Sequence, residues 1–65
     1  MVMKNTNKKY QLGYLPKIAY HIARGNEEKA ISFSNSHIEK YGEIEVNELV
    51  LLLDLIKEEQ ERLAL

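Results

Sequence analysis

The chain has 65 residues, of which 45% are apolar and 29% are charged, with a net charge of −1 and no cysteine. This length allows one small globular domain, and the absence of cysteine excludes disulfides and cysteine-based zinc or redox sites. The absence of cysteine also favours a reducing, cytoplasmic location. The longest apolar run, residues 49–53, is too short for a membrane helix, which needs about 20 apolar residues.

The N-terminal residues 1–9, MVMKNTNKK, are polar and basic, and we expect them to form a flexible arm. Residues 10–65 are expected to form a single domain of three helices. The first helix is predicted from Tyr14 to Arg24, with Pro16 in its first turn, where the missing N–H is tolerated. Its apolar residues recur with helical spacing and predict one buried stripe: Leu15, Ile18, Ala19 and Ile22.

The second helix is predicted from Glu27 to Tyr41. Gly25 suits the end of the preceding helix, and Asn26 is a favourable N-cap residue. The segment KAISFS alternates like a strand, but the sequence offers no second strand to pair with it, so helix is the better prediction. Its expected buried stripe comprises Ala30, Ile31, Ser34, His37, Ile38 and Tyr41, with Phe33 at the edge.

The third and longest helix is predicted from Val46 to Leu63. Seven of the eight residues from Leu49 to Ile56 are apolar, so this helix is apolar on two sides. The spacing predicts one internal stripe, which packs against the first two helices: Val46, Leu49, Leu53, Ile56, Gln60 and Leu63. The predicted fold class is therefore all-α, an antiparallel helical hairpin followed by a longer C-terminal helix.

The other side of the third helix invites two explanations. In one, the first two helices cover both sides of the third helix. In the other, which we favour because two short helices can hardly surround a third, the second side is a contact patch with an apolar centre and a polar rim. The predicted centre is Leu51, Leu52 and Leu55, and the predicted rim is Glu48, Glu58, Glu59 and Arg62. The expected partner is a second copy of the chain, another protein, or both.

The charges are distributed unevenly along the chain. Residues 1–25 carry five basic residues and no acid, whereas residues 26–65 carry ten acids and four basic residues, which gives −6. The alternative function is therefore nucleic-acid binding through the basic residues Lys4, Lys8, Lys9, Lys17 and Arg24. Against this alternative, Glu27 and Glu28 open the second helix, where they would oppose a phosphate backbone.

The residues that could support catalysis do not form a known motif. His21 and His37 lie on different predicted helices without metal-ligand spacing, and we expect His37 to be a core-edge histidine bonded to a backbone group. No catalytic site, metal, cofactor or small-molecule substrate is expected. The sequence predicts a non-enzymatic protein-interaction module, typical of small bacterial or phage regulators and adaptors, that self-associates through its apolar C-terminal helix.

Overall fold

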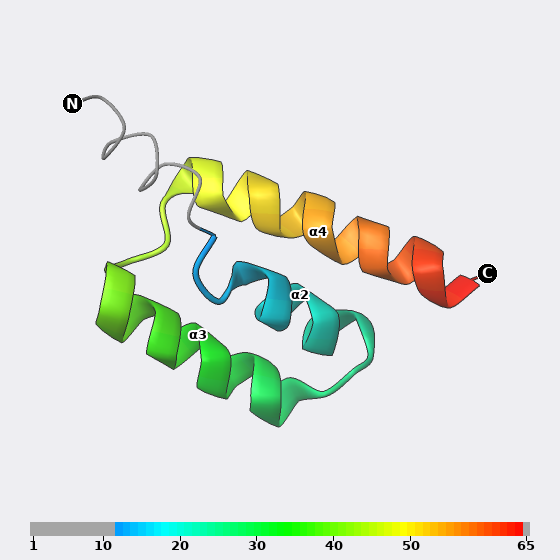
Figure 1. Ribbon diagram of the computed structural model, residues 1–65, viewed down its shortest axis with the longest axis horizontal. Helices are drawn as coiled ribbons and strands as arrows, with labels where there is room; N and C mark the ends of the chain where they lie inside the picture. Colours follow the sequence, from blue (N-terminus) through cyan, green and yellow to red (C-terminus); the bar gives the residue numbers. More distant parts are fainter. Residues whose placement is uncertain (1–11, 65) are drawn as a thin grey trace.

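The computed structural model describes residues 12–64, which form three α-helices and no strand within that span. These are α2 (Leu15–Ala23), α3 (Glu27–Tyr41) and α4 (Val46–Ala64) (Figure 1). The all-α prediction is confirmed, and the helix boundaries differ from those predicted by one residue at most. The predicted flexible arm, residues 1–9, lies outside the described residues.

Local sequence signals explain where α2 begins and ends and where α3 begins. Pro16 lies in the first turn of α2, where its missing N–H removes no helical hydrogen bond. Gly25 has φ +74°, a left-handed conformation that ends the helix and that most side chains disfavour. The Asn26 side chain then accepts a hydrogen bond from the Lys29 N–H at 3.4 Å and caps α3. These short-range interactions set the tight connection between the two helices.

The helices lie side by side, with α2 between the other two (Figure 1). α2 and α3 form the predicted antiparallel hairpin, and α4 runs along the opposite side of α2 in the same direction as α2. α2 packs against both neighbours, whereas no Cα atom of α3 comes within 8 Å of a Cα atom of α4. The short helix is therefore the central element, and the long α4 is packed on one side only.

The hydrophobic core is small and is centred on α2. Leu15, Ile18 and Ala19 are each at most 1% exposed, and they contact Leu52 of α4. Partly buried apolar side chains surround this group: Tyr14, Phe33, Ile44, Leu51, Leu55 and Ile56. On α3, Ala30 is buried as well. With so few buried residues, a domain of this size has little stability to spare.

His37, near the end of α3, is buried beside the start of α2 and covers that end of the core. The residue is 1% exposed, and its Nδ1 accepts a hydrogen bond from the Tyr14 backbone N–H at 3.2 Å. Its Nε2 lies 3.8 Å from the Glu48 carboxylate of α4, so this one ring touches all three parts of the fold. The prediction of a core-edge histidine bonded to a backbone group is confirmed.

Candidate protein-interaction surface

α4 is rotated relative to the sequence prediction: of its predicted internal stripe, Ile56 packs against the core cluster, but most of the side that faces the core is a different one. Leu52 is only 8% exposed, and Leu51 and Leu55 pack against the core cluster. Leu53, which was expected to be internal, is 64% exposed. The prediction that Leu51, Leu52 and Leu55 face outward is therefore wrong, and these leucines are the residues through which α4 contacts α2.

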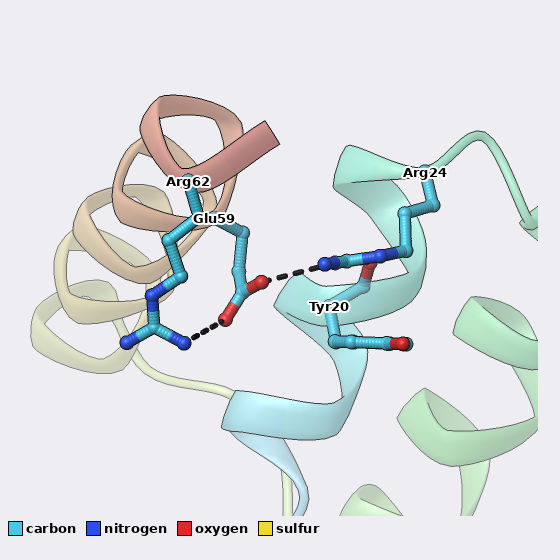
Figure 2. A network of polar contacts seen from close by, with 4 residues as sticks. All are labelled: Tyr20, Arg24, Glu59 and Arg62. Carbon is cyan, nitrogen blue, oxygen red and sulfur yellow. Dashed lines mark hydrogen bonds and ion pairs between the residues drawn. The ribbon is translucent and has the colours of Figure 1, made fainter. Parts of the chain in front are cut away.

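An ion-pair network accompanies this rotation of α4. Arg24, at the end of α2, donates from Nη1 to Glu59 Oε1 at 3.0 Å, and Arg62 donates to Glu59 Oε2 at 3.3 Å (Figure 2). The Arg24 guanidinium also lies over the Tyr20 ring, 3.6 Å from its centroid. Glu59 follows Leu52 and Leu55 by seven and four residues, which places all three on one line along α4. The rotation that forms the ion pair therefore also buries these leucines.

The predicted polar rim belongs mainly to this internal contact. Glu48 accepts a hydrogen bond from the Glu45 N–H at 2.9 Å and so caps the start of α4. The Glu59 side chain is only 16% exposed because Arg24 and Arg62 cover it. Glu58 and Arg62 are exposed, as a rim residue would be. Of the four, only Glu59 and Arg62 therefore belong to the ion-pair network, and Glu59 is the one that pairs across α2 and α4.

The exposed side of α4 carries four aliphatic side chains that we call the α4 stripe. They are Val46, Leu49, Val50 and Leu53, and their exposed fractions lie between 45% and 76%. Three of them were predicted to be internal, and Val50 belonged to neither predicted side of the helix. Lys57 and Gln60 continue the same line toward the C-terminus and are exposed, but the side that faces the core also ends in polar residues, so this polarity alone does not identify the solvent side.

A second apolar feature is an open groove beside α2 and α3, which we call the α2–α3 groove. It has a volume of about 590 Å³ and is lined by Ile22, Gly25, Glu27, Ala30, Ile31 and Ser34. Ile22 and Ile31, both predicted to be buried, are 41% and 59% exposed. Ile38, two turns beyond Ile31 on the same side of α3, is 41% exposed. The hairpin therefore leaves one flank of its apolar stripes uncovered.

The groove and the stripe lie on the same side of the molecule. Arg24 and Ile22 are two residues apart on α2, about 200° around the helix, so the ion-pair network lies on the side opposite the groove. On α4, Leu53 and Arg62 are nine residues apart and face opposite directions. Since Arg62 belongs to the network side, Leu53 points to the groove side. We call the stripe, the groove and Ile38 together the apolar face.

The residues proposed for nucleic-acid binding are only partly available. Lys4, Lys8 and Lys9 lie outside the described residues. Lys17 is exposed on the same side of α2 as Arg24, two turns earlier. Arg24 itself donates hydrogen bonds to Glu59 and to the Tyr20 backbone carbonyl, both at 3.0 Å. The structure therefore commits one of these basic side chains to an internal ion pair.

Residues 12–64 contain neither a candidate metal site nor a candidate membrane-spanning helix. No group of three or more histidine, cysteine, aspartate or glutamate side chains there could hold a metal ion. No helix in this span is long and apolar enough to cross a membrane. No protein-family model, no curated protein and no solved structure matches the chain. Its function is therefore inferred from the geometry of its own surface.

Proposed function

We propose that this protein is a non-enzymatic protein-interaction module of the cytoplasm, a small regulator or adaptor that acts by binding another protein surface through its apolar face. The observation that carries the proposal is the imbalance between core and surface. Within the described residues, five apolar residues are buried, whereas ten large hydrophobic residues are 40% exposed or more. Seven of these ten belong to the apolar face. Scattered apolar residues are ordinary on protein surfaces, but a cluster of this kind marks an interaction site.

The arrangement of the face supports this proposal. Its aliphatic side chains come from all three helices, which hold them at fixed positions through the core beneath. Glu27, Lys57 and Gln60 border it, so its apolar centre has polar residues at its edge. The proposed contact keeps the apolar C-terminal helix as its main element, but through Leu49, Val50 and Leu53 in place of the three leucines now assigned to the core.

A photoreactive side chain such as a benzophenone, introduced at position 53 or at position 54, tests the proposal in cells that express the protein. Both residues are exposed, and they point in different directions from α4. We expect a discrete protein adduct, either with a second copy or with another protein, from position 53 and none from position 54. Equal, diffuse labelling from both positions, or no adduct from position 53, would contradict the proposed function.

A further inference from the structure

We infer that the apolar face binds a second copy of this chain in a reciprocal dimer, in which the α4 stripe of each copy enters the α2–α3 groove of the other. This inference rests on the proposed function and names its partner. It follows from a pairing of shapes on one face, because the stripe projects from α4 and the groove is recessed beside α2 and α3. A two-fold axis that exchanges the copies forms both contacts at once.

The positions along the helices agree with this exchange. In Figure 1, the middle of α4, the end of α2 and the start of α3 lie at similar positions along the long direction of the molecule. A two-fold axis parallel to the long direction of the molecule leaves each residue at the same position along that direction. It also places α4 of one copy over the hairpin of the other. Leu53 of one copy then faces Ile22 and Ile31 of the other, which are 41% and 59% exposed.

Charge complementarity supports the same pairing. Glu27 is the charged residue among those that line the groove. Lys57 follows Leu53 by one turn on the exposed side of α4, beside the α4 stripe. Reciprocal insertion brings Lys57 of each copy next to Glu27 of the other, so two pairs of opposite charge form at the rim. Such pairs select the register of an interface more than they add affinity.

The size of the face suits a small dimer. Its aliphatic side chains are about half exposed and together present on the order of 500 Å² of apolar surface, comparable to the largest patch on a typical monomer. With its polar rim, the face approaches the ~800 Å² per partner of a standard interface. Chains of this length commonly gain their stability from oligomerisation, and a second copy is present wherever the chain is made.

The first test measures molar mass by sedimentation over a wide range of concentrations. We expect the unmodified chain to be a dimer. Leu53→Lys should raise the dissociation constant by roughly a hundredfold, because a two-fold interface loses the leucine twice and each loss is worth about tenfold. Ser32→Lys, which makes the same change in charge on an exposed position of α3 away from the groove, should leave the dimer intact.

The second test exchanges the two charges. Glu27→Lys and Lys57→Glu should each weaken the dimer several-fold, and the double variant should restore it, because the opposite charges then meet again. Glu28→Lys is the matched control for Glu27→Lys, since it lies in the same first turn of α3 but outside the groove lining. A double variant no stronger than either single variant would overturn the reciprocal arrangement.

The two proposals can fail separately. A chain that is monomeric at every concentration would overturn the dimer. If photo-crosslinking at position 53 then still yields a discrete adduct with another protein, the proposed function stands without self-association. A monomeric chain with no adduct at that position would contradict both proposals.

Discussion

Among the described glycines, Gly13, just before α2, is the one whose backbone lies too close to neighbouring side chains for any other residue. Its φ is +57°, and a Cβ atom built there would lie 2.7 Å from the Tyr41 ring and 2.8 Å from the His37 ring. The absence of a side chain lets this turn press against α3, so that the Tyr14 N–H reaches His37 Nδ1 at 3.2 Å. The packing of this turn against His37, which covers the end of the core, therefore depends on the lack of a side chain at Gly13.

Gly13→Ala should lower the free energy of unfolding by about 2–3 kcal/mol, because it adds a steric clash to the strain of a positive φ. Gly25→Ala is the matched control, since Gly25 has φ +74° but no atom within 4 Å of the added Cβ. It should cost only about 1 kcal/mol. Urea denaturation followed by circular dichroism measures both. Equal losses would mean that the Tyr41 and His37 rings move aside.

At the scale of the element, α4 contains adjacent leucines with opposite environments. Leu52 is 8% exposed and belongs to the core, and Leu53 is 64% exposed on the apolar face. A rotation of α4 by about half a turn would exchange their environments. The Arg24–Glu59 pair, with N–O distance 3.0 Å, forms in only one of these orientations. It is partly exposed and stabilises the fold modestly, so it selects the orientation more than it adds stability.

Leu52→Ala should lower the free energy of unfolding by about 2–5 kcal/mol, enough to unfold much of the population of so small a domain. Leu53→Ala should change it by no more than about 0.5 kcal/mol when measured at a concentration where the chain is monomeric. By the same reasoning, Leu51→Glu with Leu55→Glu should abolish helicity. A larger loss from Leu53→Ala than from Leu52→Ala would show that α4 has the opposite rotation in solution.

At the scale of the whole molecule, the basic and acidic parts of the chain meet within the fold. Arg24 comes from the basic part and Glu59 from the acidic part, 35 residues further along, and they pair across α2 and α4 (Figure 2). The side of the molecule that carries this network also carries Lys17, whereas the opposite side carries the apolar face. One side of the molecule is therefore polar, and the other carries the face that we propose binds a partner.

The dimer should persist from low salt to about 1 M salt, because its contact is mainly apolar and salt screens only the rim charges. Light scattering at both ionic strengths measures this.

We also expect little retention on duplex DNA at low salt, since Arg24 is held by Glu59 and acidic residues outnumber basic ones. Retention that falls steeply with salt, and falls further in Arg24→Ala, would instead favour the nucleic-acid function.

Sequence patterns were sufficient for the helices but only partly sufficient for the surface. The start of α3 at Glu27 follows from Asn26 and Gly25, whose effects reach only three or four residues. The burial of Leu15, Ile18 and Ala19 followed from spacing, because α2 has a single apolar side. The same spacing rule failed for α4, whose first half is apolar on both sides, so that two rotations satisfied it equally well.

The sequence by itself determined that this protein is all-α, where its helices begin and end, and that its C-terminal helix has more apolar surface than one side needs. The tertiary structure decided that α2 is the central helix, that Leu52 is buried while Leu53 is exposed, and that the exposed residues of all three helices share one face. The physical reason is range: caps and turns act between neighbouring residues, whereas the rotation of a helix depends on what distant segments place beside it, here Arg24 beside Glu59.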